Sequence, residues 1–116
     1  MTSALNAALS ALEAYEKKLN VTANNIANVN TDGFKKSRAV LQEGDPSGVV
    51  VTLSRVNTPG SPIPSMDGTG EIRESSNVDL AEEIVDLQTT KYGFQANLKT
   101  LKAEDEILGS LLDILG

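Results

Sequence analysis

Apolar side chains recur at the spacing of a helical seam at both ends of the chain, and the middle lacks this pattern. Near the N-terminus, with Glu16 as a polar member, they are Leu5, Leu9, Leu12, Leu19, Ala23 and Ile26. Near the C-terminus, with Lys91 and Asp105 as polar members, they are Leu80, Ile84, Leu87, Phe94, Leu98, Leu101, Leu108, Leu112 and Leu115. Alternating steps of three and four place such residues along one narrow side of a helix. Because a helix cannot bury this stripe alone, the pattern predicts two helices that pair.

Local signals set the ends of the two predicted helices. The first is expected over residues 3–28, with Ser3 as its N-cap and an Asn-rich end, since Asn tolerates the backbone conformation that terminates helices. The second is expected over residues 79–115. Asp79 is a favourable N-cap, and Glu82 stands three positions later, as in a capping box.

The middle of the chain has the composition of a small β-containing insertion. Residues 49–56 are rich in β-branched side chains and predict a strand. Residues 57–70 hold three of the four prolines and predict an irregular path, and residues 70–74 predict a short return strand. We therefore expect one structural unit in three segments: a helix and turn over 1–34, a β/loop excursion over 35–76 and a helix over 77–116. The predicted fold is mainly α, with the two terminal helices in an antiparallel coiled-coil-like pair.

Composition narrows the classes of function. The net charge of −6 argues against nucleic acid as a partner, because phosphate binding needs a basic surface. The chain has no Cys and no His, which removes the commonest ligands and general bases, so we expect no catalytic residue, metal or cofactor. No apolar run reaches the roughly 20 residues that span a bilayer, and no cleavable signal is apparent, so direct membrane insertion is not expected.

Some residues have two interpretations that the sequence leaves open. Glu16, Lys91 and Asp105 fix the register of the pair, lie at its edge with their charges in water, or face the lumen of an assembly of helices. Gly93 either permits close approach of another backbone or is a tolerated surface glycine. Charge is also uneven, with a net +2 over residues 1–38 and a net −5 over residues 75–116, which would favour pairing of the two ends.

Two motifs at the ends of the chain carry a family resemblance. Residues 23–35 read ANNIANVNTDGFK, and they resemble the run that closes the first helix in the rod and hook family of bacterial flagellar axial proteins. Residues 76–85 resemble the second motif of that family. The positions that match the family, and that we expect to serve assembly, are Asn24, Asn25, Ile26, Ala27, Asn28, Asn30, Thr31, Gly33, Phe34, Asn77, Val78 and Asp79.

The resemblance implies a function in assembly rather than in catalysis. It implies a structural subunit of the basal-body rod or hook, which associates with its own copies and with other rod and hook proteins. It also implies export by the flagellar type III apparatus without a cleaved signal peptide, and a place in the rod that crosses the periplasm. In length the chain is most like the small proximal-rod proteins of the C type. A second interpretation is a stand-alone helical hairpin that binds another protein, as an adaptor or export chaperone does.

Overall fold

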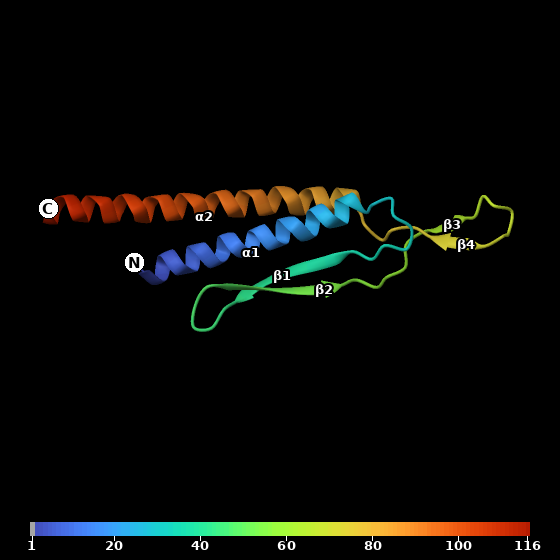
Figure 1. Cartoon of the computed structure of the whole chain (residues 1–116), viewed down its shortest axis with the longest axis horizontal. Helices are drawn as coiled ribbons and strands as arrows, with labels where there is room; N and C mark the ends of the chain where they lie inside the picture. The colour runs from blue at the N-terminus through green and yellow to red at the C-terminus, as the bar shows by residue number, and fades with distance from the viewer. Residues whose placement is uncertain (1) are drawn as a thin grey trace.

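The computed structural model describes residues 2–116 as two antiparallel helices joined by two β-hairpins (Figure 1). Helix α1 spans Thr2–Ala27 and helix α2 spans Leu80–Leu115. The four strands are β1 (Ser37–Glu43), β2 (Val49–Arg55), β3 (Pro62–Pro64) and β4 (Ile72–Glu74). The predicted mainly α class with a small β insertion is confirmed, as is the antiparallel course of the helices. Their coiled-coil geometry remains a prediction.

The ends of the helices differ in detail from the expected caps. The Asp79 side chain caps α2, because its Oδ1 accepts from the backbone N of Ala81 at 3.0 Å and of Glu82 at 3.4 Å. The Glu82 carboxylate does not complete a capping box; it pairs instead with Lys36 and Arg38. The prediction that Ser3 caps the first helix is wrong, since Ser3 lies inside α1, which already includes residue 2.

Helix α1 is the middle layer of the molecule. It packs against α2 on one side and against the β1–β2 hairpin on the other, as Figure 1 shows. Its buried apolar residues are all small: Ala8, Ala11 and Ala14. Small side chains allow both neighbouring layers to come close to the α1 backbone, at the cost of a core with little apolar volume.

Both hairpins are antiparallel. The β1–β2 register runs from Ser37 opposite Arg55 to Glu43 opposite Val49, so the predicted strand over residues 49–56 is confirmed. The hairpin is fixed to α1 where the backbone N of Val49 donates to Ser10 Oγ at 3.0 Å.

The second hairpin partly corrects the prediction of an irregular path. Pro62–Pro64 forms β3 and pairs with β4, with Ile63 opposite Arg73. In Figure 1 this hairpin extends beyond the turn end of the helix pair, and the molecule measures 79 Å along its longest axis. Pro is tolerated here because a two-stranded ribbon consists only of edge strands.

Candidate functional site

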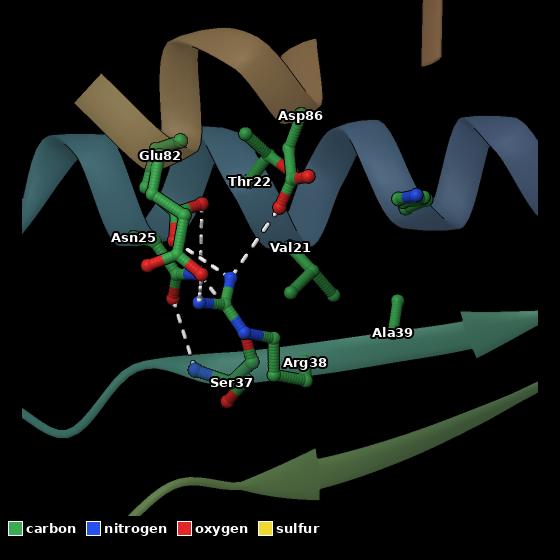
Figure 2. Close-up of a pocket in the computed structure, with 10 residues that line it drawn as sticks. Val21, Thr22, Asn25, Ser37, Arg38, Ala39, Glu82 and Asp86 are labelled. Atoms are coloured by element: carbon green, nitrogen blue, oxygen red, sulfur yellow. Dashed lines mark hydrogen bonds and ion pairs between the residues drawn. The ribbon is translucent and has the colours of Figure 1, made fainter. Parts of the chain in front are cut away.

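One amide from the first motif joins three elements of the fold. Asn25, at the last turn of α1, is 1% exposed. Its Nδ2 donates to the backbone O of Ser37 at 2.9 Å, and its Oδ1 accepts from the backbone N of Ser37 at 3.0 Å (Figure 2). The same Nδ2 also donates to Glu83 Oε2 at 3.3 Å. Asn25 thus bonds the start of β1 as a neighbouring strand would, and at the same time holds the first turns of α2.

Glu83 places a fully buried carboxylate at this point. The guanidinium of Arg38 on β1 compensates it, with Nη1 donating to Glu83 Oε1 at 3.0 Å and to Asp86 Oδ2 at 3.4 Å. The other guanidinium nitrogen pairs with Glu82, and Figure 2 shows Arg38 reaching toward the acidic side chains of α2. A buried carboxylate is stable only when paired and hydrogen-bonded, as Glu83 is here.

The second motif fixes the segments that cross between the helices and the hairpins. Asn77 Oδ1 accepts from the backbone N of Lys36 at 2.7 Å, and its Nδ2 donates to the backbone O of Val56 at 2.8 Å and of Thr58 at 3.0 Å. The backbone N of Asn77 also donates to the O of Phe34 at 3.2 Å. One Asn from each motif therefore serves the same purpose, and we call the cluster of Asn25, Ser37, Arg38, Asn77 and Glu83 the junction.

Other residues of the first motif shape the turn itself. Asn28 Nδ2 donates to the backbone O of Asn24 at 2.8 Å, and Thr31 Oγ1 donates to Asn28 Oδ1 at 3.0 Å. Gly33 has a φ of +71°, which disfavours any side chain, and its N donates to the O of Glu74 at 2.7 Å. Three further predicted residues, Ile26, Phe34 and Val78, are half-buried, and Ala27, Asn30 and Asp79 are exposed.

The structure places the predicted apolar stripe mostly beside the contact between the helices rather than within it. The most covered side of α2 carries a polar row at seven-residue spacing: Glu83, Thr90, Asn97 and Glu104. Next to that row lie the half-buried Leu87, Phe94, Leu101 and Leu108, whereas Leu80, Ile84, Leu98, Leu112 and Leu115 are exposed. On α1, Leu5, Leu12 and Ile26 are half-buried and Leu9, Leu19 and Ala23 are exposed.

These residues line a groove along the open side of the helix pair. One part, of about 570 Å³, is lined by Leu19, Leu87, Phe94 and Leu98, with Glu16 and Lys91 also in its wall. The other part, of about 630 Å³, is lined by Leu5, Leu98, Leu101 and Leu108, with Asp105 in its wall. Leu98 belongs to both parts, and we call them together the outer groove. The three polar members of the stripe therefore lie in the walls of this groove.

The sequence analysis missed several residues that position the site. Arg38 and Glu83 were not singled out, because a lone charge in an amphipathic segment usually faces water. Gly93 lies against the ring of Tyr15, and a Cβ there would be 2.6 Å from Tyr15 Cζ. The predicted close approach of another backbone is therefore wrong, because the group that lies against Gly93 is the Tyr15 side chain.

Residues 2–116 carry neither a metal-ligand cluster nor a membrane-spanning helix. No group of three or more acidic side chains in that range is arranged to hold a metal ion. Neither helix, over the described range, has the length and apolarity needed to cross a membrane.

Comparison with known families gives matches at both ends of the chain. Residues 5–35 match the flagella basal body rod protein family, and residues 71–114 match the C-terminal family of flagellar basal body rod FlgEFG proteins. The first range contains Asn25, and the second contains Asn77 and Glu83. Ser37 and Arg38, which complete the junction, lie between the two ranges.

Individual relatives agree with these matches. The flagellar basal-body rod protein FlgG of Buchnera aphidicola is 33% identical over 106 residues, covering 90% of this chain and 36% of that relative. The flagellar hook protein FlgE of Borreliella burgdorferi is 47% identical over 49 residues, covering 39% of this chain and 11% of that relative. FlgG of Bacillus subtilis is 46% identical over 43 residues, covering 37% of this chain and 16% of that relative. The chain thus spans about a third or less of the length of these curated relatives.

Proposed function

The chain belongs to the flagellar rod and hook family of axial proteins, with FlgG among its relatives, and from this premise we propose that it is a structural subunit of the basal-body rod or hook. One observation carries the proposal. The two ends that match the family come together at the junction, where Asn25 and Asn77 tie both helices to the strands between them. The family motifs thus fix the relative positions of the helices and strands, as a structural subunit requires.

The chemistry of the junction supports a mechanical function. The Asn25 amide and the Glu83 carboxylate bond to groups of the same chain, and Arg38 bonds to three acidic side chains of α2. Bonds of this kind resist relative sliding of α1, β1 and α2, because breaking those of Asn25 or Glu83 would leave a buried polar group unpaired. A subunit that passes torque to its neighbours without doing chemistry needs this resistance.

The finer parts of the proposal follow from family membership. The subunit associates with its own copies and with other rod and hook proteins, leaves the cytoplasm through the flagellar type III export apparatus without a cleaved signal, and resides in the rod that crosses the periplasm. The relatives reported above, which are hook proteins and FlgG rod proteins, favour a FlgG-like member over the C type expected from the sequence.

The proposal is tested in the organism that encodes the chain. An internally tagged copy, with the tag inserted after Gly68 at the exposed tip of the β3–β4 hairpin, replaces the native gene, and basal bodies are purified. We expect the tagged chain in the purified basal bodies and loss of motility on deletion of the gene. A chain that stays in the cytoplasm, with normal basal bodies in the deletion strain, would contradict the proposal.

A second candidate function is an adaptor or export chaperone that binds another protein through the outer groove. The observation that favours it is the exposed apolar wall of that groove, where Leu98 is 43% exposed. A chaperone would stay in the cytoplasm with its client and be absent from purified basal bodies. The same fractionation therefore separates the two functions.

A further inference from the structure

The β1–β2 hairpin lies along α1 and is attached to it at two places. At the base of the hairpin, both backbone groups of Ser37 bond to the Asn25 amide. At its tip, the backbone N of Val49 donates to Ser10 Oγ at 3.0 Å. Within residues 2–116, these are the two places where hydrogen bonds join α1 to this hairpin. The helix rises about 22 Å between Ser10 and Asn25, and the seven residues of β1 extend about 23 Å, so a whole hairpin length separates the attachments.

The two attachments are unequal. At the base, Asn25 is 1% exposed and makes two hydrogen bonds with Ser37, and Arg38 adds ion pairs with three acidic side chains of α2. At the tip, the single bond between Ser10 and Val49 stands alone. Because a folded segment opens first where the fewest contacts hold it, the tip should separate from α1 more readily than the base.

The contact between the two attachments is incompletely filled. Near the base, a cavity of about 240 Å³ is lined in part by Val21 of α1 and Ala39 of β1 (Figure 2). Near the tip, a second cavity of about 150 Å³ is lined in part by Ala14 of α1 and residues 49–51 of β2. Unfilled space gives no dispersion contact, so packing holds this hairpin on α1 only weakly. The attachments therefore decide whether the hairpin stays closed.

Gly48 brings the backbone of the tip directly against Ser10. Its φ of +96° is a conformation that residues with a side chain disfavour. A Cβ at this position would lie 2.7 Å from Ser10 Oγ. A single added methyl group would thus press the tip away from the hydroxyl that holds it.

We propose that Ser10 is a latch for the β1–β2 hairpin. When the bond to Val49 opens, the tip leaves α1 and the hairpin pivots at the junction, while α1 and α2 stay paired. This device goes beyond the proposed function, because it depends on contacts within one chain and not on what the chain joins. It gives a molecule with a rigid junction one part that opens on its own.

The first test compares two amides of the same hairpin that make the same kind of bond. The backbone N–H groups of Ser37 and Val49 each donate to a side chain of α1. Hydrogen exchange of the full chain, followed by NMR at low urea concentrations, measures how often each bond opens. We expect the protection of Val49 to be lower than that of Ser37 by about tenfold or more. Its dependence on urea should also be weaker, because opening of the tip exposes little surface.

Equal protection and equal urea dependence of the two amides would overturn the proposal, since tip and base would then open together. This test needs no substitution, so it decides the proposal even where a variant fails to fold.

The second test uses one introduced thiol, because the chain has no Cys. Ala14→Cys places the thiol in the wall of the cavity under the tip. Thr90→Cys places it on the covered side of α2, where Thr90 is 2% exposed. In each background, Ser10→Ala removes the latch, and Ser3→Ala, at an exposed serine of the same helix, is the matched control. The rate of reaction with a water-soluble thiol reagent measures opening.

We expect Ser10→Ala to speed the reaction of the Ala14→Cys thiol by about 2- to 10-fold, as the loss of one hydrogen bond implies, and to leave the Thr90→Cys thiol unchanged. Gly48→Ala should also speed the reaction of the Ala14→Cys thiol. Gly68→Ala, at a φ of +77° with nothing within 4 Å of the added Cβ, should not.

Far-UV circular dichroism checks that each variant stays folded. The proposal is overturned if Ser10→Ala changes the reaction of neither thiol, because the closed hairpin would then not depend on the hydroxyl. It is also overturned if both thiols react faster to the same extent, because the hairpin and the helix pair would then open as one unit.

Discussion

One end of helix α2 buries a charged side chain, whereas the other end exposes apolar ones. At its first turns the fully buried residue is a carboxylate, Glu83, held by Asn25 and Arg38. At its last turns the largest apolar side chains are outside, and Leu115 is 84% exposed. This is the reverse of the usual distribution in an independent globular domain. The comparison teaches that polar contacts fix the internal geometry of this chain, while much of its apolar surface stays exposed.

Directionality explains the division. Hydrogen bonds and ion pairs in a buried site have strict geometry, so the junction defines one arrangement of α1, β1 and α2. Apolar contact is not directional and scales with area, so the exposed apolar side chains of the outer groove and of the last turns of α2 do not define one arrangement in this way. A chain built in this way keeps its own shape while its apolar side chains remain exposed.

The largest effect on stability is expected for Asn25→Ala, which removes the polar contacts that hold α1, β1 and α2 together at the junction. The change removes three hydrogen bonds and leaves both backbone groups of Ser37 and one oxygen of Glu83 without this partner. The free energy of unfolding should fall by about 3 kcal/mol, since each unpaired buried group costs about 1–3 kcal/mol. Urea denaturation followed by circular dichroism measures the change.

Asn24→Ala is the matched control for this prediction. Asn24 is the same residue type one position earlier, but it is exposed, and its side chain accepts only one long bond, from Asn28 at 3.3 Å. We expect its loss to cost under about 1 kcal/mol. Equal effects of the two variants would mean that helix propensity, rather than the junction, decides stability at this turn.

The sequence predicts those parts of the fold in which buried side chains are apolar and exposed side chains are polar. The two helices, the strand at residues 49–56 and the Asp79 cap follow from local signals that the tertiary structure did not override. The orientation of the helices about their axes does not follow, because the covered side of α2 is polar. Thr90 Oγ1 bonds to the O of Asp86 at 2.7 Å, and Asn97 Nδ2 bonds to the O of Gly93 at 2.9 Å. These polar side chains can be buried because they bond to carbonyl oxygens of their own helix. The hydrophobic pattern therefore predicts that the neighbouring side of α2 is the covered one.

The candidate site was predictable only as far as its motif. Asn25 and Asn77 were identified from the two sequence motifs. No local feature of the sequence indicates that the Asn25 amide bonds a strand and that the Asn77 amide bonds two crossing segments. Arg38 and Glu83 are 45 residues apart in the chain and meet only after β1 and α2 have packed on α1. Contacts of this kind are set by tertiary structure, and a single sequence does not encode them as a readable pattern.

An intermediate effect is expected at Gly93, where the covered part of α2 can be compared with its uncovered part. Gly93→Ala would place a Cβ 2.6 Å from Tyr15 Cζ, so the ring must move. We expect a loss of about 1 kcal/mol, the balance of overpacking against the gain in helix propensity. Gly109→Ala, which meets nothing within 4 Å, should instead stabilise α2 by up to about 1 kcal/mol.

Thermal unfolding of the two variants therefore gives shifts of opposite sign. A stabilising shift for both would mean that the Tyr15 ring moves without cost. The contact of the Tyr15 ring with Gly93 would then not help to hold α1 and α2 in one relative position.

The smallest expected effect is the pH dependence of the link between the β3–β4 hairpin and the rest of the chain. The Lys35 ammonium, and after it the backbone N of Gly60, donate to the Glu74 carboxylate and hold its pKa below the ordinary value of 4.5. A lowered pKa means that the folded state binds this proton less readily than the unfolded state. The stabilisation is therefore present above about pH 4.5 and is lost as the pH falls through the folded-state pKa. Because the carboxylate is 39% exposed, solvent screens much of it.

Replacing this carboxylate isolates its contribution. Glu74→Gln should lower the melting temperature slightly at neutral pH and lose that difference as the pH falls through the folded-state pKa of Glu74. Glu71→Gln, on the same hairpin and outside the ion pairs of the described residues, should show no such convergence. A Glu74→Gln difference that is constant with pH would mean that the hairpin is held by its other links to the turn after α1. These are the backbone bond from Gly33 to the O of Glu74 and the ion pair of Arg73 with Asp32 at 2.8 Å. The Lys35–Glu74 pair would then contribute nothing to the orientation of the hairpin.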